Sequence, residues 1–234
     1  MTIVALLKES DDIFYLGADS QWTDSVGTKT FKTKITVLNG KGNIVAWATA
    51  GNPQIGVAEF GNWAKNYQRT ETTTWESFIT DAAGEFARLN RIKKEIGEKA
   101  GQDINASAFK REHLCEMLIC GWLNHRSAGY FVGDDGNYQS LDLLGMMTIG
   151  TGGPFADAVY KTSLYFQKKL DLTIHQAFQH LMEITSRYAD RCSLPYEFVK
   201  ISEGKRELFR SKEPEPGVEE IKPAKPEGKG SSES

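Results

Sequence analysis

The second residue of the chain, Thr2, could serve as an N-terminal nucleophile. Met1 precedes a small residue, so methionine removal should be easy and would leave Thr2 with a free α-amine. Such a threonine carries a nucleophile and a base on one residue, because its hydroxyl attacks while its own amine takes the proton. The amine has a reference pKa of ~7.7–8.0, which suits proton transfer near neutral pH. Many proteins begin with Met-Thr for other reasons, so Thr2 alone predicts little.

Two other groups of residues are candidates for chemistry. The four histidines show no spacing typical of metal ligands, and we predict neither a metal site nor a cofactor. The segment Gly150-Thr151-Gly152-Gly153-Pro154 precedes a predicted helix, a position where a phosphate could bind. It lacks the Lys and Ser/Thr of a Walker loop and the spacing of a dinucleotide site. By itself this segment predicts only a tight turn between a strand and a helix.

The composition is that of an ordinary folded protein. Of the 234 residues, 40% are hydrophobic and 25% are charged, with a net charge of −3. These values exclude a collagen-like or wholly disordered chain, and the balanced charge gives no reason to expect nucleic acid or an anionic membrane as partner. No run approaches the ~18 apolar residues of a membrane span. Three cysteines without metal-like spacing favour a reducing cytoplasm, and they are Cys115, Cys120 and Cys192.

The first half of the chain indicates four strands and then two helices. β-prone apolar runs separated by turn-forming residues predict strands at 2–7, 13–16, 34–38 and 44–49. Pro53 suits the first turn of a helix, which we expect to extend to residue 68. Apolar residues at helical spacing predict a second, longer helix over 75–99.

The second half indicates three strands, two helices and two final strands. The strands are predicted at 117–122, 129–132, 146–149, 197–201 and 207–209. One helix begins at Pro154 and extends to about residue 168. The next begins at Thr173, which together with Gln176 predicts a capping box.

The last residues differ from the rest in composition. Residues 211–234 hold four of the seven prolines, among Glu, Lys, Gly and Ser, with few apolar side chains. Such a segment cannot bury enough apolar surface to offset the entropy of ordering it. We therefore predict one domain over 1–210 and a disordered tail over 211–234.

Six short segments between residues 2 and 203 carry a family resemblance when they are taken together. They are Thr2-Ile3-Val4-Ala5, Gly17-Ala18-Asp19-Ser20, Lys34, Thr49-Ala50-Gly51-Asn52, the run 149–156, and Ala189-Asp190-Arg191-Cys192-Ser193. In this order they resemble the proteasome β-subunit family of N-terminal nucleophile hydrolases, which includes the HslV-type and Anbu-type bacterial proteins. The resemblance implies an α/β (α+β) fold, a four-layer αββα sandwich. The predicted order of strands and helices agrees with that fold.

The resemblance also implies roles for the matched residues. Thr2 is the nucleophile, and Lys34 is a fixed positive charge that favours the oxygen anion and disfavours protonation of the amine. Asp19 pairs with Lys34 and keeps it charged. The backbone N–H of Gly51 stabilises the tetrahedral oxyanion, and Thr151 takes the place of a serine near the amine.

Five further positions follow from the same comparison. Asp190 and Ser193 orient the amine and a water molecule, while a bland interpretation is a hydrogen-bonded pair at a helix end. Trp22, Lys32 and Thr49 line the first specificity pocket by family position, although packing alone would also account for such residues there.

Three departures from the family pattern leave alternatives open. The distance from Thr2 to Asp19 is one residue longer than usual, which the hairpin at 9–12 can absorb. Many relatives begin Thr-Thr, so a rival register places Met1 at the nucleophile position and makes the subunit inactive. Thr151 keeps the hydroxyl of the family's serine but adds a methyl group. The spacing of Lys34 favours the active register.

The resemblance implies a cytoplasmic threonine-type endopeptidase subunit that assembles with copies of itself into a ring or double ring. Its substrates would be peptides or unfolded proteins, and an ATP-dependent unfoldase is the partner that the resemblance implies. Two alternatives keep the fold: a small-molecule amidase with the same nucleophile, and a catalytically inactive structural ring subunit.

Overall fold

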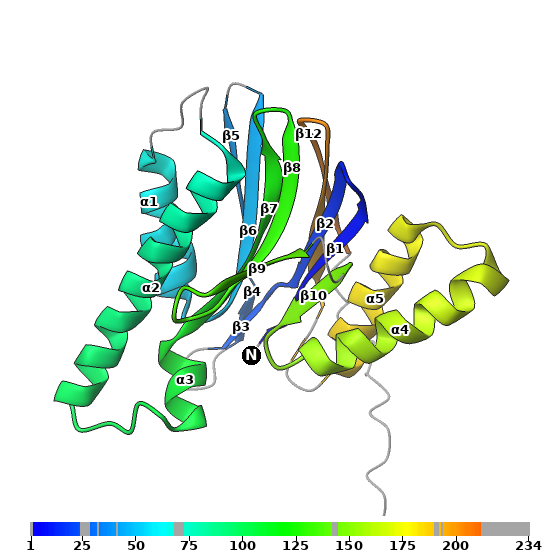
Figure 1. The fold of residues 1–234 in the computed structure, drawn as a ribbon. Helices are drawn as coiled ribbons and strands as arrows, with labels where there is room; N and C mark the ends of the chain where they lie inside the picture. The colour runs from blue at the N-terminus through cyan, green and yellow to red at the C-terminus, as the bar shows by residue number, and fades with distance from the viewer. Residues whose placement is uncertain are drawn as a thin grey trace, which may run out of the picture.

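The computed structural model describes residues 2–23, 29–31, 33–40, 42–67, 73–141, 145–189, 192 and 194–211. These residues form two five-stranded antiparallel sheets with helices on the outer face of each (Figure 1). Apart from Ser211, the predicted tail at 211–234 lies outside the described residues.

The first sheet contains the start of the chain in its interior. Its strands, in spatial order, are β10 (Met146–Ile149), β1 (Val4–Ser10), β2 (Ile13–Asp19), β11 (Tyr196–Ser202) and β12 (Lys205–Arg210). Strands from the two ends of the domain are therefore neighbours, and the first strand has a partner on each side.

The second sheet follows the chain order from edge to edge. Its strands are β5 (Ile35–Gly40), β6 (Asn43–Gly51), β7 (Cys115–Leu123), β8 (Arg126–Val132) and β9 (Tyr138–Ser140). A separate hairpin of β3 (Gln21–Thr23) and β4 (Lys29–Phe31) connects the two sheets in sequence. We call the end of the sandwich from which this hairpin projects the hairpin end (Figure 1).

The helices form the two outer layers. They are the π-helical segment η1 (Gln54–Glu59), α1 (Phe60–Asn66), α2 (Trp75–Lys99), α3 (Ser107–His113), α4 (Gly153–Leu170) and α5 (Ile174–Tyr188). Helices α1 and α2 lie against the second sheet, and α4 and α5 lie against the first (Figure 1). This arrangement confirms the predicted four-layer αββα sandwich.

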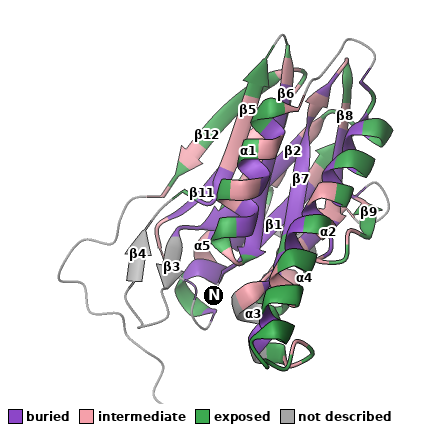
Figure 2. Cartoon of the chain, turned by 90° about the vertical axis from the view of Figure 1, so that its left-hand side faces the viewer, coloured by how far each residue is buried: buried purple, intermediate pink, exposed green. Residues whose placement is uncertain are grey.

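Alternation along the strands produces the layers. On β1, Ala5 and Leu7 pack toward α5, whereas Val4 and Leu6 face the second sheet. Successive side chains of a strand point to opposite faces, so an uninterrupted apolar run fits a strand that is covered on both sides. Figure 2 shows the result, with buried central strands and outer helices that are exposed on their solvent side.

The long predicted helices are confirmed, and their periodicity explains where they pack. Helix α2 buries Phe78, Phe86 and other apolar residues at helical spacing against Trp47 of the second sheet. The predicted capping box of α5 is present, with the Gln176 N–H donating to Thr173 Oγ1 (3.2 Å) and the Thr173 N–H donating to Gln176 Oε1 (2.9 Å).

Four short elements were missing from the predicted order: β3, β4, α3 and β9. Three-residue strands are too short to show an alternating pattern, and the seven residues of α3 are too few for a helical repeat to stand out. Helix α3 is held by tertiary packing, because its buried Phe109 lies against Gly97 of α2, where any side chain would collide with the ring.

All three cysteines are buried and form no disulfide. Among the helices that the structure describes, none has the length and apolar character needed to cross a membrane.

Candidate active site

Thr2 lies two residues before the first residue of β1, at the hairpin end (Figure 1). Its side chain is buried, with 7% of the residue exposed. The Thr2 hydroxyl donates a hydrogen bond to Asp19 Oδ1 at 2.6 Å. The candidate nucleophile therefore lies inside the protein, against a carboxylate from the neighbouring strand.

Asp19 is brought to Thr2 by the pairing of the first two strands. The register Val4↔Ala18 places Asp19 beside Ile3, and the Asp19 N–H donates to the Ile3 carbonyl at 3.2 Å. In return the Ile3 N–H donates to Asp19 Oδ1 at 2.9 Å. The same carboxylate oxygen thus fixes both the hydroxyl of Thr2 and the backbone that follows it.

Lys34 reaches the same point from the second sheet. It directly precedes β5, only 3% of it is exposed, and its Nζ lies 2.9 Å from Asp19 Oδ1. Nζ also donates to Thr2 Oγ1. One hydroxyl therefore contacts a buried ammonium and a buried carboxylate, although the three residues come from three separate segments of the chain.

The environment of Lys34 acts on its charge in two directions. Burial lowers the pKa of the ammonium below its ordinary value of 10.5. The Asp19 carboxylate opposes this shift, and Cys192 and Glu197 oppose it to a smaller extent. The net direction is a lowered pKa, so Lys34 loses its proton more easily than an exposed lysine does.

Gly51 ends β6 at the same end of the sandwich. It pairs with Cys115 and has a φ of +116°, and a side chain on it would run into the carbonyl oxygen of Leu114. Only glycine fits this position without strain. Asn90 of α2 fixes the partner strand, because its side chain accepts from the Cys115 N–H (2.9 Å) and donates to the Cys115 carbonyl (3.2 Å).

Thr151 lies in the turn between β10 and α4, which confirms the predicted strand-to-helix turn. The Gly152 N–H donates to the Thr2 carbonyl at 3.4 Å, and a side chain on Gly150 would collide with that carbonyl. The turn therefore packs on the backbone of Thr2, while the Thr151 side chain is exposed.

The remaining predicted site residues are only partly described. Thr49 is buried in β6 and packs against Gly56, and Trp22 lies on β3. Lys32, Asp190 and Ser193 lie outside the described residues. Their predicted roles stay predictions.

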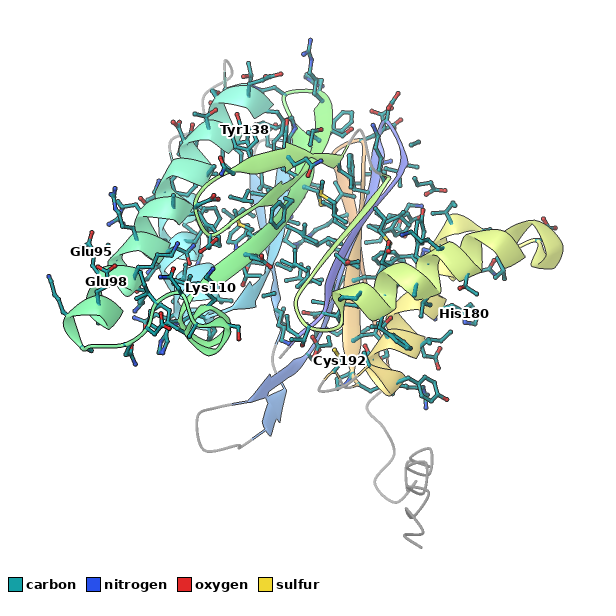
Figure 3. All side chains as sticks on the ribbon, turned by 60° about the horizontal axis from the view of Figure 1, so that its bottom comes forward. Glu95, Glu98, Lys110, Tyr138, His180 and Cys192 are labelled. Carbon is teal, nitrogen blue, oxygen red and sulfur yellow. The ribbon has the colours of Figure 1, made fainter. Side chains whose placement is uncertain are left out.

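Two residues near the site had no predicted role. Cys192 lies at the hairpin end (Figure 3), where its Sγ would be 2.8 Å from a Cβ on Gly152. Glu197 on β11 is 2% exposed and accepts from the Lys34 backbone N–H at 3.1 Å. A signal for Glu197 existed in the sequence: alternation along β11 places it on the same face as Val199 and Ile201, which lie between the sheets.

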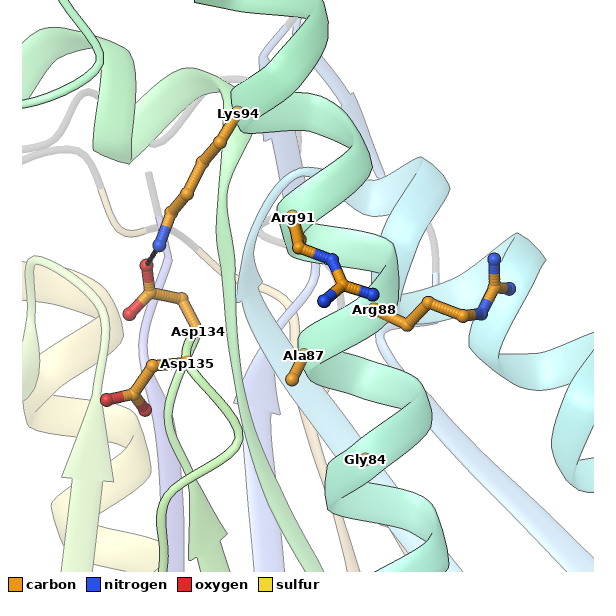
Figure 4. Close-up of a pocket in the computed structure, with 7 residues that line it drawn as sticks. All are labelled: Gly84, Ala87, Arg88, Arg91, Lys94, Asp134 and Asp135. Atoms are coloured by element: carbon orange, nitrogen blue, oxygen red, sulfur yellow. Dashed lines mark ion pairs between the residues drawn. The ribbon is translucent and has the colours of Figure 1, made fainter.

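A cavity of about 300 Å³ lies elsewhere, between α2 and the loop after β8 (Figure 4). Two of its cationic side chains have opposite charges beside them: Lys94 pairs with Asp134 at 2.9 Å, and Arg88 donates to Glu85. None of the predicted site residues lines this cavity. Among the described residues, no three His, Cys, Asp or Glu side chains lie together as metal ligands would.

The contacts around Thr2 are of a kind that can activate a hydroxyl as a nucleophile. A hydroxyl that donates to a carboxylate and accepts from an ammonium has its proton directed away and its developing negative charge stabilised.

Comparisons with known proteins give the fold an independent reference. No protein-family model matches the sequence, and no curated protein matches it either. Solved structures do match. Anbu (ancestral beta-subunit) from Yersinia bercovieri has a TM-score of 0.64 and 15% sequence identity, over 89% of this chain and 86% of that chain.

Two further solved structures agree. The Anbu complex from Pseudomonas aeruginosa, described as a helical assembly, has a TM-score of 0.61 at 12% identity, over 90% of this chain and 86% of that chain. Eukaryotic HslV from Trypanosoma brucei has a TM-score of 0.52 at 14% identity, over 86% of this chain and 99% of that chain. The chain therefore has the fold of the Anbu and HslV proteins, which confirms the resemblance at the level of structure. At these identities the likeness shows the fold, and the chemistry rests on the residues themselves.

Proposed function

We propose that this chain is a threonine-type endopeptidase subunit, an N-terminal nucleophile hydrolase in which removal of Met1 exposes Thr2. One observation carries the proposal: Thr2 Oγ1 contacts both the Lys34 ammonium and the Asp19 carboxylate in a buried setting. Burying a lysine ammonium costs free energy unless an opposite charge lies beside it. Here the ion pair of Lys34 and Asp19 is formed where both groups contact the Thr2 hydroxyl.

The first half of the reaction forms an ester on Thr2. The free α-amine of Thr2 takes the hydroxyl proton while Oγ1 forms a bond to the carbonyl carbon of the peptide. Lys34 stabilises the negative charge on Oγ1, and Asp19 holds Lys34 in place. The Gly51 N–H donates to the oxyanion, an interaction worth ~3–4 kcal/mol in comparable sites. The C–N bond then breaks, and the leaving nitrogen receives the proton from the α-amine.

The second half releases the acyl group. A water molecule gives a proton to the α-amine and attacks the ester carbon; the proton returns to Oγ1 as the ester bond breaks, and the released peptide carboxylic acid loses its remaining proton to solvent. Thr151, Asp190 and Ser193 orient the amine and this water. Thr49, together with Trp22 and Lys32, forms the first specificity pocket.

A peptidase of this kind needs a barrier against folded proteins, and assembly with further copies of the chain supplies one. We propose a closed ring or double ring in the cytoplasm, acting on peptides and unfolded proteins and served by an ATP-dependent unfoldase. The Anbu complex from Pseudomonas aeruginosa is a helical assembly, which supports self-assembly and makes an open helix the alternative geometry.

The test is covalent labelling of the N-terminal residue. Purified protein is treated with a peptide epoxyketone, and intact mass is measured together with peptide turnover. We expect loss of Met1, one adduct on Thr2, and no adduct or turnover in Thr2→Ala. Thr80→Ala, on an exposed position of α2, is the matched control and should keep both.

Other results would decide against the proposal. Peptide cleavage by protein that retains Met1, or undiminished cleavage by Thr2→Ala, excludes Thr2 as the nucleophile. Turnover of small amides without peptide cleavage indicates the amidase. Assembled protein that neither reacts with the probe nor cleaves peptides indicates a structural subunit.

A further inference from the structure

Glu197 is a buried carboxylate on the strand that lies next to Asp19. It sits near the start of β11, where Tyr196 pairs with Asp19 and Glu197 pairs with Ala18. Only 2% of Glu197 is exposed. A charged residue at such a position is retained only where its charge and its hydrogen bonds are satisfied.

The contacts of Glu197 are made with the segment that carries Lys34. Oε1 accepts from the backbone N–H of Lys34 at 3.1 Å and from that of Ile35 at 3.4 Å. Strand β5, which begins at Ile35, is an edge strand of the second sheet. At the start of this edge strand, Glu197 provides a side-chain acceptor for two consecutive backbone N–H groups.

The second oxygen of Glu197 completes the attachment. Oε2 accepts from Thr33 Oγ1 at 3.4 Å and from Arg210 Nε at 3.2 Å, while Arg210 Nη2 donates to Thr33 Oγ1 at 3.0 Å. Three consecutive residues, 33 to 35, are thereby bound to one side chain from the opposite sheet. The Arg210 side chain is 60% exposed, so most of the anchoring comes from the buried carboxylate.

We propose that Glu197 is a positioning residue for the reaction: it fixes the backbone at Lys34 so that Nζ meets Thr2 Oγ1 and Asp19 Oδ1. Through β11, one strand sets the place of both partners of the nucleophile, because Tyr196 pairs with Asp19 and Glu197 binds Lys34. The effect on catalysis rests on the proposed function, whereas the attachment itself is a property of the fold.

Two variants distinguish the hydrogen bonds that Glu197 forms with residues 33–35 from its negative charge. Glu197→Leu removes every acceptor, whereas Glu197→Gln keeps one amide oxygen that can accept from both backbone N–H groups. Glu207→Leu, on an exposed position of the neighbouring strand β12, is the matched control. Each protein is assayed for kcat and KM with a fluorogenic peptide and for amide hydrogen exchange in the segment 33–38.

We expect Glu197→Leu to lower kcat about 10²-fold, the loss that a displacement of about 1 Å causes. KM should change by less than about threefold, because Thr49 of the proposed specificity pocket lies on β6, outside the segment that Glu197 binds. Exchange at Lys34 and Ile35 should become faster without a matching change in β6. Glu197→Gln should recover most of kcat and of the protection, and Glu207→Leu should resemble the wild type.

Unchanged exchange at Lys34 and Ile35 in Glu197→Leu would overturn the proposal, as would an unchanged kcat or an equal rise in exchange across β6 and β7. Should Glu197→Leu fail to fold, Glu197→Asp replaces it, because the shorter carboxylate cannot reach both amides. If the wild type cleaves no peptide, the proposed function fails, and the exchange measurement still decides whether Glu197 holds this segment.

Discussion

The reactivity that we propose for Thr2 depends on the charge of one neighbouring residue, Lys34. Lys34 is held between burial, which lowers its pKa and favours the neutral amine, and Asp19, which favours the ammonium. Between its lowered pKa and 10.5, the unfolded chain binds more protons than the folded one. The contribution of Lys34 to stability therefore rises with pH in that window. Peptide turnover should instead fall as pH rises through this window, because the proposed mechanism needs the protonated form of Lys34.

We therefore predict that peptide turnover declines on the alkaline side at a pH below that at which an exposed lysine titrates. Asp19→Asn removes the largest interaction that keeps Lys34 charged, so this alkaline limb should move to lower pH. Among the described residues, Thr2, Cys192 and Glu197 also act on Lys34, and they are unchanged in the variant. The measurement is kcat as a function of pH.

Asp135→Asn serves as the control for this experiment, because Asp135 binds the backbone of Asn137 in a loop outside the site. Its alkaline limb should coincide with that of the wild type. A limb that stays in place or moves to higher pH in Asp19→Asn would show that Lys34 is not the group that titrates.

At the level of single residues, the sequence predicted three residues that the structure brings together, and it assigned no role to Glu197, which binds one of them. Thr2, Asp19 and Lys34 stand out because short motifs surround them, and the structure brings the three together. Glu197 has no such motif, and its contact with Lys34 joins positions 163 residues apart. Alternation along β11 places Glu197 on the face between the sheets, but only the stacking of the two sheets makes Lys34 its partner, and that pairing leaves no local trace in the sequence.

Among the secondary-structure elements, the end of β6 is the one most constrained by the site. Gly51 adopts a φ of +116°, and the Leu114 carbonyl occupies the space that a side chain needs. We predict that Gly51→Ala displaces this strand end, with a strain of about 1–2 kcal/mol from the left-handed backbone alone. If its N–H binds the oxyanion, kcat should fall about 10²–10³-fold.

Gly40→Ala provides the comparison within the same sheet. Gly40 ends β5, does not have a positive φ, and has open space where the methyl group of an alanine would project. Thermal unfolding and kcat of this variant should be close to those of the wild type. Wild-type kcat in folded Gly51→Ala would instead rule out Gly51 as an oxyanion donor.

Length decided which elements could be predicted. The 25 residues of α2 repeat an apolar pattern many times, and the predicted range matches the observed one. The hairpin of β3 and β4 contributes three residues per strand and shows no repeat at all. Such elements form because the chain on both sides is already fixed, so their stability comes from the whole fold.

On the scale of the whole molecule, the candidate active site lies where the ends of several strands meet. β1 and β11 begin at the hairpin end, β2 and β6 end there, and Lys34 enters from the segment before β5. Thr2, the proposed nucleophile, lies two residues before β1, a strand with a partner on each side, and its carbonyl accepts from the Gly152 N–H. The domain must therefore be intact up to β12 for the site to form.

This requirement predicts where the chain can be shortened. Ser211 still belongs to the fold, since its N–H donates to the Tyr196 carbonyl at 2.9 Å and its Oγ accepts from the Tyr196 N–H at 2.8 Å. A stop after Ser211 removes only the segment that composition predicts to be a tail. Unfolding temperature and peptide turnover should then equal those of the full chain.

A stop after Gly204 is the contrasting truncation, because it removes β12. Phe198 loses the stacked ring of Phe209 (centroids 4.6 Å apart), and Glu197 loses Arg210. At about 2–4 °C per kcal/mol for a chain of this size, this loss should lower the unfolding temperature by several degrees. Calorimetry on both truncations checks the boundary, and equal destabilisation by the two would place residues of the predicted tail inside the fold.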